Sequence, residues 1–456
     1  MAAAALAGVA VPAAAADHGV LDPSFGDGGR VTSDFDTVAF AAGVAVGPDG
    51  SVFAGGSYGE ASLTAFAVTK WRADGSPDPT FGDNGQVHLQ PASSPGAANG
   101  VALSPDGKVV LAGATDEMVV MRLDADGKPD QTFGQDGEVD VAFGSNPLAG
   151  AAAVTVLSDG SIVVAGSTGT SPNPTDNTMA VARISSAGDV LWKTTTAFGT
   201  SPSSATAIVS DAPAATVTVA GSVIADDGTR DFALARYRLD DGSLDAGFGD
   251  NGRATTAFAD ASAEGHAIAR TADGGLLVAG DLFPQQSSNT PFGLARYTDE
   301  GKLDEAFGDG GKVVGSAPEG NTFANAVVST SCGTVVVGGL TFDTSAGHQE
   351  FSLTGYDAAG HLDGDFGTAG RTLTPFGDKD AFGSALAVAP SGALVMAGGI
   401  TGSGNRQMGA ARYTDACAPP PPPPTDKDQC KNGGWKNFGT RFKNQGQCVR
   451  FVNTGK

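Results

Sequence analysis

Short apolar runs separated by turn residues recur along most of this chain. One run, Val52 to Gly55, follows the turn Pro48-Asp49-Gly50, and another, Val109 to Gly113, follows Pro105-Asp106-Gly107. Runs of about four to seven residues that are rich in small and β-branched side chains and bounded by Asp-Gly are typical of short strands. Within these segments no helical period extends beyond a single turn. The pattern therefore predicts an all-β protein.

The strands belong to a repeated unit. Its clearest signal is a turn of the form Leu-Asp-x-x-Phe-Gly-x-x-Gly, or Pro-Asp in place of Leu-Asp. The phenylalanines of this turn are separated by 56, 52, 115, 59 and 59 residues and are Phe25, Phe81, Phe133, Phe248, Phe307 and Phe366. The long interval is two periods, and a degenerate copy, Gly188 to Trp192, lies within it. The chain thus carries seven copies of a unit of about 57 residues.

Three further signals recur in phase with this turn: an Asp-Gly turn, a strand that ends in Ala-Gly or Gly-Gly, and a strand centred on Ala-Arg-Tyr, as in Ala235-Arg236-Tyr237. Each unit therefore holds about four strands, which is what one blade of a β-propeller requires. A four-stranded sheet buries its faces only against neighbouring blades. We predict a seven-bladed β-propeller of four-stranded blades in which the turn phenylalanine fills the gap between adjacent blades. An open β-solenoid is the competing architecture.

The phase of the blades is not fixed by the repeat alone. The chain after residue 16 begins with a turn strand, Arg30-Val31-Thr32, and its last repeat ends with Ala411-Arg412-Tyr413. If each blade ends with its turn strand, Arg30 to Thr32 completes the last blade and closes the ring.

The four signals in this order resemble the delta-60 repeat family of secreted bacterial proteins, which is a predicted β-propeller class. The resemblance covers about residues 20–416. It is weakest in the fourth copy, which lacks the Leu-Asp and Phe-Gly pieces. The resemblance implies a propeller and export, and it implies no shared activity.

Composition supports a folded, acidic body. The chain has 67 glycines in 456 residues without a Gly-X-Y period, 41% hydrophobic residues and a formal charge of −23. The charge is uneven, since residues 426–456 carry +5 and the preceding residues carry −28. Nucleic-acid binding requires neutralisation of phosphates by Lys and Arg, so an acidic body of this kind argues against it.

The chain divides into four expected segments. Residues 1–16 are apolar, end in small residues and resemble the core of a signal peptide, although the usual basic start is missing. This stretch is too short to span a membrane, and no other run approaches that length. We expect the propeller over 17–416, a Pro-rich linker over 417–427 and a basic tail module over 428–456. The mature protein is expected to be exported, without a membrane span, and monomeric.

Four cysteines fit an exported protein, where disulfides form readily. A module of fewer than about 30 residues needs a covalent staple, so we predict a disulfide between Cys430 and Cys448. Cys332 and Cys417 would then form the second. Aromatic and basic residues of the tail are a candidate surface for sugars or an anionic cell-wall polymer: Trp435, Lys436, Phe438, Arg441, Phe442 and Lys443. The alternative, which we favour, is a small disulfide core with solvated lysines.

No catalytic, cofactor-binding or metal-binding residue is assigned, and no cofactor is expected. Gly55 to Gly59 matches Gly-x-Ser-x-Gly around Ser57, but no helix follows, as a nucleophile elbow requires. Asp124 to Asp130 resembles part of a calcium loop, yet Gln135 stands where the closing glutamate belongs. The five histidines are scattered.

The leading functional hypothesis is a non-enzymatic binding scaffold at the cell envelope or outside the cell, whose partner is a cell-wall polymer, a glycan or a protein. The alternative is a propeller enzyme that acts on glycans through carboxylates at the central channel. The lining of that channel discriminates the two. Convergent Asp or Glu with His or Tyr from several blades favours an enzyme, whereas a lining of small apolar residues favours a scaffold.

Overall fold

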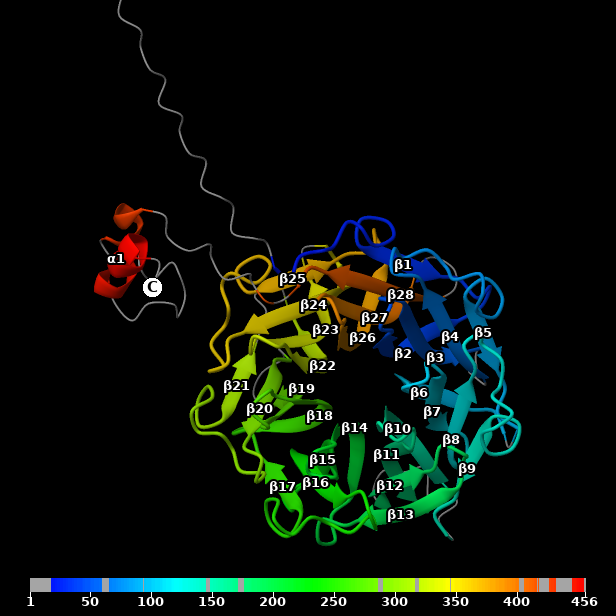
Figure 1. Cartoon of the computed structure of the whole chain (residues 1–456). Helices are drawn as coiled ribbons and strands as arrows, with labels where there is room; N and C mark the ends of the chain where they lie inside the picture. Colours follow the sequence, from blue (N-terminus) through cyan, green and yellow to red (C-terminus); the bar gives the residue numbers. More distant parts are fainter. Residues whose placement is uncertain are drawn as a thin grey trace, which may run out of the picture. The chain divides into compact units, whose positions relative to one another are not determined.

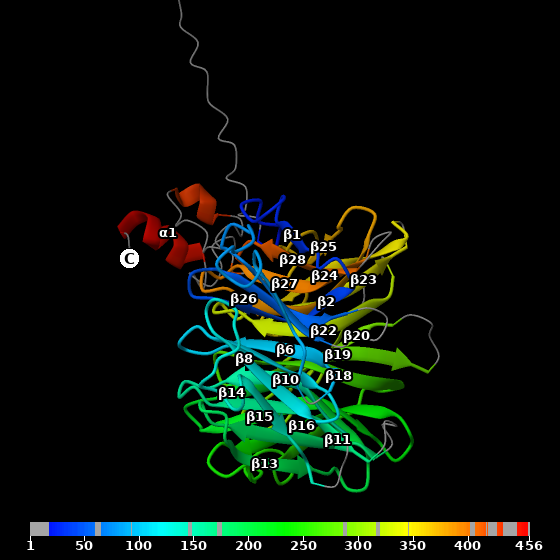
Figure 2. The same cartoon turned by 90° about the vertical axis from the view of Figure 1, so that its right-hand side faces the viewer.

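Twenty-eight strands form seven four-stranded antiparallel sheets arranged as a closed ring in this computed structural model (Figure 1). The structure describes residues 18–59, 65–92, 94–144, 148–170, 176–285, 290–315, 320–344, 346–401, 406–415, 417, 426–431 and 445–454. The expected signal peptide and most of the expected linker lie outside these residues. Seen edge-on, the strands run across the thickness of the ring (Figure 2). The predicted seven-bladed propeller is confirmed, and the solenoid alternative is wrong.

We number the blades in chain order and give the strands of each blade from the innermost outward. Blade 1 contains β2 (Ala39–Val46), β3 (Val52–Tyr58), β4 (Ala65–Trp71) and β5 (Gln86–Leu89). Blade 2 contains β6 (Ala97–Leu103), β7 (Val109–Ala114), β8 (Met118–Leu123) and β9 (Glu138–Val141). Blade 3 contains β10 (Leu148–Val156), β11 (Ile162–Gly169), β12 (Thr178–Ile184) and β13 (Val190–Thr196). Blade 4 contains β14 (Ser203–Asp211), β15 (Thr216–Ile224), β16 (Arg230–Arg238) and β17 (Arg253–Thr256).

The remaining blades follow the same order until the ring closes. Blade 5 contains β18 (Ala261–Arg270), β19 (Leu276–Pro284), β20 (Phe292–Tyr297) and β21 (Lys312–Gly315). Blade 6 contains β22 (Thr322–Ser329), β23 (Val335–Asp343), β24 (His348–Tyr356) and β25 (Arg371–Thr374). Blade 7 contains β26 (Asp380–Val388), β27 (Leu394–Thr401), β28 (Arg406–Tyr413) and, from the start of the chain, β1 (Arg30–Ser33).

The ring is closed by the pairing of the first strand with the last. β1 runs antiparallel to β28, with Arg30 opposite Ala411 and Ser33 opposite Met408. The phase that the sequence left open is therefore the one in which each blade ends with its turn strand. The N-terminal strand supplies the outer edge of blade 7 and joins the two ends of the propeller.

The hydrophobic core lies between blades. The propeller has seven apolar clusters among its described residues, and each consists of side chains from two neighbouring blades. The cluster around Phe133, for example, joins Val120 of blade 2 to Ile162 and Val164 of blade 3. All six turn phenylalanines are fully buried. The predicted role of this residue as a filler between blades is confirmed.

The degenerate fourth copy of the turn keeps an aromatic filler. A Cβ on Gly242 of blade 4 would lie 2.6 Å from the Trp192 ring, just as one on Gly301 of blade 5 would lie 2.7 Å from Phe248. The indole Nε1 of Trp192 also donates to the Leu239 carbonyl at 2.9 Å. Trp192 therefore takes the place that phenylalanine holds in the other six turns, although the local sequence differs.

The recurring Ala-Gly or Gly-Gly has a steric cause. In every blade the innermost strand carries an irregularity in its pairing with the second strand, as between Ala41 and Gly43. The second strand approaches this bulge closely, and a Cβ on Gly56 would lie 2.0 Å from the Phe40 carbonyl oxygen. Glycine occupies the same place in the other blades, where a Cβ would lie 1.8–2.0 Å from a carbonyl oxygen, at Gly113, Gly166, Gly221, Gly280, Gly339 and Gly398.

The remaining residues, 1–18 and 417–456, form a second unit. Its described elements are a 3₁₀-helix, η2 (Lys427–Cys430), and α1 (Gln445–Thr454). The sequence did not predict α1. Cys430 and Cys448 form the predicted disulfide. Cys332 and Cys417 are also disulfide-bonded, and since no cysteine of the chain is free, they are joined to each other. No helix in the described part of the chain is long and apolar enough to cross a membrane.

Because the turn phenylalanine fills the space between two sheets, we expect Phe133→Ala to lower the free energy of unfolding by about 3–5 kcal/mol. The measurement is urea unfolding followed by tryptophan fluorescence. Leu191→Ala is the control, since Leu191 is 52% exposed, and we expect it to change stability by less than about 0.5 kcal/mol. Equal losses in the two variants would contradict an inter-blade core.

Candidate functional site

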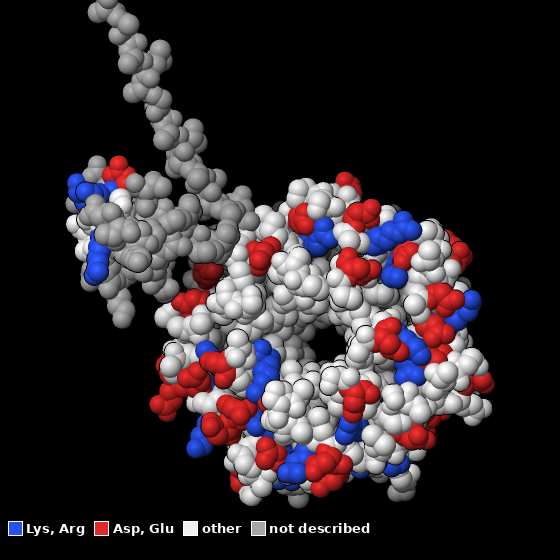
Figure 3. Space-filling view, in the orientation of Figure 1, with Lys and Arg blue, Asp and Glu red and all other residues white. Residues whose placement is uncertain are grey.

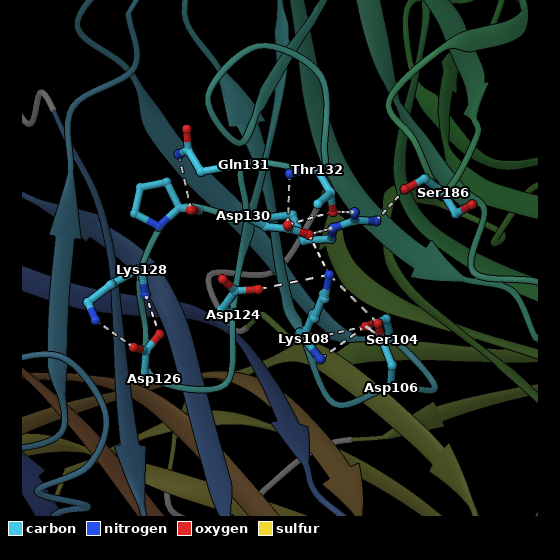
Figure 4. Close-up of polar contacts among 12 residues, drawn as sticks. Ser104, Asp106, Lys108, Asp124, Asp126, Lys128, Asp130, Gln131, Thr132 and Ser186 are labelled. Atoms are coloured by element: carbon cyan, nitrogen blue, oxygen red, sulfur yellow. Dashed lines mark hydrogen bonds and ion pairs between the residues drawn. The ribbon is translucent and has the colours of Figure 1, made fainter.

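A cluster of polar side chains surrounds Asp130, in the turn between β8 and β9 (Figure 4). Its Oδ2 accepts from Lys108 Nζ at 2.8 Å and from Arg122 Nε at 2.6 Å. Its Oδ1 accepts from the backbone N–H and the hydroxyl of Thr132 at 3.0 and 2.7 Å. The Asp130 and Arg122 side chains are only 2% and 6% exposed. This is a buried ion pair with its carboxylate fully hydrogen-bonded.

The same pair recurs around the ring. The cation comes from the third strand of a blade and the carboxylate from the turn that leads into its fourth strand. The equivalent pairs are Lys70 with Asp78 at 2.8 Å, Arg412 with Asp22 at 2.8 Å, Arg296 with Asp304 at 3.2 Å and Arg236 with Asp245 at 3.7 Å. Blade 6 has Gly355 where the cation would stand, and a Cβ there would lie 2.5 Å from Phe366.

The cation of this pair also links two blades. The Arg122 guanidinium lies 4.4 Å from the centre of the Phe133 ring, and its Nη1 donates to the Ser186 carbonyl of blade 3 at 2.7 Å. Arg296 makes the corresponding bond to the Ala358 carbonyl of blade 6 at 2.8 Å. Because this unit repeats in register with the turn phenylalanine, we assign it to the architecture of the ring rather than to catalysis.

The electrostatics of these carboxylates agree with that assignment. Burial acts to raise the pKa of Asp78, but hydrogen bonds from Lys70 and Thr80 outweigh it and lower the pKa to about 2. Burial likewise acts to raise the pKa of Asp130. Hydrogen bonds from Lys108, Thr132 and Arg122 outweigh it and lower this pKa far below the ordinary range. A carboxylate held in its ionised form is a poor proton donor or acceptor near neutral pH.

Two motifs noted in the sequence lie within the repeat. In the calcium-like segment Asp126 bonds to Lys128 at 2.7 Å, while Asp130 bonds to Lys108 and Arg122 (Figure 4). Among the described residues, three or more His, Cys, Asp or Glu side chains gather nowhere in a way that could hold a metal ion. Ser57 lies within β3, is fully buried and donates to the Ala98 carbonyl at 3.2 Å.

The innermost strands are mostly small and uncharged. Four of the seven carry no ionisable side chain. The other three carry Asp211 on β14, Glu264, His266 and Arg270 on β18, and Asp380 on β26. Figure 3 shows the central opening bordered largely by uncharged residues, with most charges toward the periphery.

Strand β18 is the exception to this rule. The Arg230 guanidinium of blade 4 pairs with Glu264, and the Arg270 guanidinium pairs with Asp211 of blade 4 at 2.5 Å. His266 Nε2 lies 3.2 Å from Asp281 Oδ2. The other carboxylate oxygen of Asp281 accepts from the Ala324 N–H of blade 6 at 2.9 Å. The ionisable groups of the inner strands thus concentrate in blade 5, and each already has a partner.

A second departure from the repeat is a groove of about 900 Å³ at the outer edge of blade 4. It is lined by residues 197–199, by Asp231 of β16, by Arg253 and Thr255 of β17 and by Gly301 of blade 5. A groove of about 600 Å³ lies at the corresponding place on blade 7, beside Arg30, Phe376 and Trp71. Sequence reasoning missed both β18 and this groove. A comparison of the inner strands across the repeats would have singled out β18 by its Glu264, His266 and Arg270, whereas no sequence signal marks the groove.

The tail surface expected from the sequence lies outside the part of the chain that the structure describes. Trp435, Lys436, Phe438, Arg441, Phe442 and Lys443 all lie outside the described residues. The four cysteines are the predicted residues that the structure does bring together, in two disulfides.

Comparison with known proteins supports a β-propeller and identifies no activity. The model of a family described as a domain of unknown function (DUF5122), a β-propeller, matches residues 47–81, 104–133 and 216–248. These segments lie in blades 1, 2 and 4 and make up a minority of the chain, and they support the resemblance of the repeats to a delta-60-type β-propeller family. No curated protein matches the sequence.

Several solved structures are similar in fold. A gluconolactonase from Xanthomonas campestris is 16% identical over 90% of this chain and 99% of its own, with a TM-score of 0.36. The α-L-arabinofuranosidase Arb93A from Fusarium graminearum is 12% identical over 84% and 94%, with a TM-score of 0.39. The β-propeller domain of the Trilobed protease from Pyrococcus furiosus is 11% identical over 82% and 94%, with a TM-score of 0.40. With values this low, nothing about the activity of this chain rests on them.

We expect Asp130→Asn to lower the free energy of unfolding at pH 7 by about 3 kcal/mol, because it leaves the buried Arg122 and the partly buried Lys108 without this carboxylate. The folded-state pKa of Asp130 lies below the ordinary 3.8, so the ion pair stabilises fully above that value and is lost as the pH falls through the folded-state pKa. The difference between wild type and variant should therefore shrink at pH 3 and below.

The measurement is urea unfolding at pH 7 and at acidic pH. Asp126→Asn is the matched control, since the Asp126 side chain is exposed and bonds to Lys128, and the change should affect stability little at either pH. A difference between wild type and Asp130→Asn that does not depend on pH would contradict a stabilising carboxylate at this position.

Proposed function

We propose that this chain is an exported, non-enzymatic β-propeller scaffold that binds its ligand outside the cell or at the cell envelope. The observation that carries this proposal is the composition of the innermost strands, whose residues are small and mostly uncharged. Their few ionisable side chains are tied to partners: Arg270 to Asp211, Glu264 to Arg230, His266 to Asp281, and Asp380 to the Gln349 N–H. An enzyme with its site in the channel needs carboxylates that converge and are free to act.

Export is supported by two disulfides, because such bonds persist in oxidising compartments outside the cytoplasm. The apolar segment 1–16 points the same way. In this setting the closed ring provides a rigid frame, and specificity resides in the surfaces that depart from the repeat.

A glycan-active enzyme is the second candidate, and one observation favours it. Glu264 and Asp281 stand directly opposite each other on β18 and β19, and His266 contacts Asp281. Two carboxylates in proximity are the usual catalytic groups of glycoside hydrolysis. Their present partners, Arg230 and the Ala324 N–H, are those expected of structural links between blades.

We expect the purified protein to bind one or more cell-wall or extracellular polysaccharides without releasing product. The test incubates the protein with a panel of such polysaccharides and scores retention by co-sedimentation and release of reducing ends. Release of reducing ends that His266→Ala or Glu264→Gln abolishes would overturn the scaffold and establish the enzyme. Absence of retention on every polysaccharide would contradict a glycan-binding scaffold.

The tail is a separate candidate surface, through Trp435, Phe438, Phe442 and the basic residues Lys436, Arg441 and Lys443. We expect deletion of residues 425–456 to leave polysaccharide retention and cell association unchanged, since a small disulfide core with solvated lysines accounts for these residues. The deletion keeps Cys417 and hence the disulfide to Cys332. Loss of cell association with an unchanged melting temperature would instead assign attachment to the tail.

A further inference from the structure

The groove on blade 4 lies where other blades make a repeated contact. In four blades, the side chain at one equivalent register position of the outermost strand donates to a main-chain carbonyl of the connection that precedes the same blade. These contacts join Gln86 to Asp34 at 2.9 Å, Lys312 to Ala257 at 3.2 Å, Arg30 to Pro375 at 2.7 Å, and Lys193 to Ala142. In blade 2 the Glu138 carboxylate accepts from the Ala92 N–H in a similar way. The contact draws the outer strand toward the connection.

Blade 4 lacks this contact. Its equivalent residue is Arg253, which stands opposite Ala235 just as Lys312 stands opposite Ala295 and Arg30 opposite Ala411. The equivalent carbonyl is that of Ala197, which lines the same groove but receives no hydrogen bond from Arg253. The groove is correspondingly larger here than on blade 7, about 900 Å³ against about 600 Å³.

The Arg253 guanidinium is left without an anion. Its Nη1 makes one long hydrogen bond, 3.4 Å, to the Asn251 carbonyl, and its Nε is buried without a partner. Among the described residues no carboxylate lies within ion-pairing distance of it, whereas the arginines of the third strands are paired. A planar guanidinium with unused donors beside a groove is suited to a carboxylate that binds through two oxygens.

The opposite part of the groove supplies hydrogen-bond acceptors. The Asp231 carboxylate lines it and accepts no hydrogen bond from any residue that the structure describes. Burial raises the pKa of Asp231, and the nearby charge of Asp227 adds to the effect. Ser201 and Thr255 add hydroxyl groups, and the half-buried Phe198 adds an aromatic ring. Asp226, Asp250 and Lys302 line the groove as well, and Asp250 accepts from Asn251 at 2.8 Å. The groove thus combines an arginine that lacks a carboxylate partner, a second cation, three carboxylates, hydroxyls and a ring.

We propose that this groove binds an acidic saccharide of the uronic-acid class, with the sugar carboxylate on Arg253 and sugar hydroxyls donating to Asp231. A saccharide is favoured because the groove combines polar groups that accept and donate with apolar side chains such as Phe198, Val223 and Ile224, so that it can engage both the hydroxyls and the ring face of a sugar. The inference rests on the proposed binding function and names its site and ligand class.

Isothermal titration of the full-length protein with trigalacturonate tests this site. We expect saturable binding that weakens at least about tenfold when the carboxyl groups of the sugar are reduced to alcohols, and at least about tenfold in Arg253→Gln, because both changes remove a charge-assisted bidentate contact. Glutamine already occupies the equivalent position in blade 1 as Gln86, so the variant should fold with an unchanged melting temperature.

Arg30→Gln is the matched control, since Arg30 is the equivalent residue on blade 7 and bonds to the Pro375 carbonyl. It should leave trigalacturonate affinity unchanged. Equal affinity of wild type and Arg253→Gln, or no saturable binding by folded wild type, overturns the site. Tighter binding of a short peptide through its C-terminal carboxylate, lost in Arg253→Gln, overturns the saccharide class.

Failure here is distinguishable from failure of the scaffold. If trigalacturonate does not bind but the protein is retained on the polysaccharide panel without product release, the proposed ligand site is wrong and the scaffold proposal stands. If reducing ends are released from the panel, the scaffold is wrong whatever the groove binds.

Discussion

The mutual burial of neighbouring blades is the constraint on which this structure depends. A single four-stranded sheet leaves both faces exposed, and the seven apolar clusters show each face covered by the next blade. The arrangement has no natural end, so the chain must close. Pairing of β1 with β28 achieves this by joining the N-terminal strand to the last blade. Because β1 continues along the chain into β2 of blade 1, the pairing ties blade 7 to blade 1.

The repeat also determines how charged residues should be interpreted. Asp130 has the properties that usually mark a catalytic carboxyl, since it is buried, strongly perturbed and surrounded by polar groups. Its counterparts Asp22, Asp78 and Asp304 hold the same kind of cation in other blades. A feature present in most blades serves what all blades need, which is adhesion to the next blade. Function is therefore to be sought where one blade differs from the others.

Much of this architecture could be predicted from the sequence, because its signals are local and repeated. Phe25 and its equivalents mark the turn, and the Asp-Gly and Ala-Gly pairs place the strands. The bulge behind Gly56 was not visible, since it depends on which residues pair across two strands. The place of Trp192 between blades was hidden by the loss of the flanking motif. Helix α1 was missed because it lies in a module held by a disulfide, where regular periodicity is weak.

The candidate site could not be predicted for a related reason. Arg253 is unremarkable in sequence, since other outer strands also begin with a basic residue, as with Lys312 and Arg30. What sets it apart is a contact that it does not make, and only the register of β16 with β17 shows which contact that is. In the same way Glu264 and His266 stand out only once β18 is compared with the six other inner strands.

Three of the departures from the repeat meet at one interface. The Arg230–Glu264 and Asp211–Arg270 pairs both join blade 4 to blade 5, and the groove beside Arg253 reaches from blade 4 to Gly301 of blade 5. Replacing small apolar residues by partly buried charges does not improve packing, because desolvation opposes the attraction within each pair. Arg253, which lies beside the same interface and does not bond to the connection before its blade, stabilises the fold even less. Three such departures at one of seven interfaces are difficult to explain by the needs of the ring, and they are what a ligand site built into a repeated frame requires.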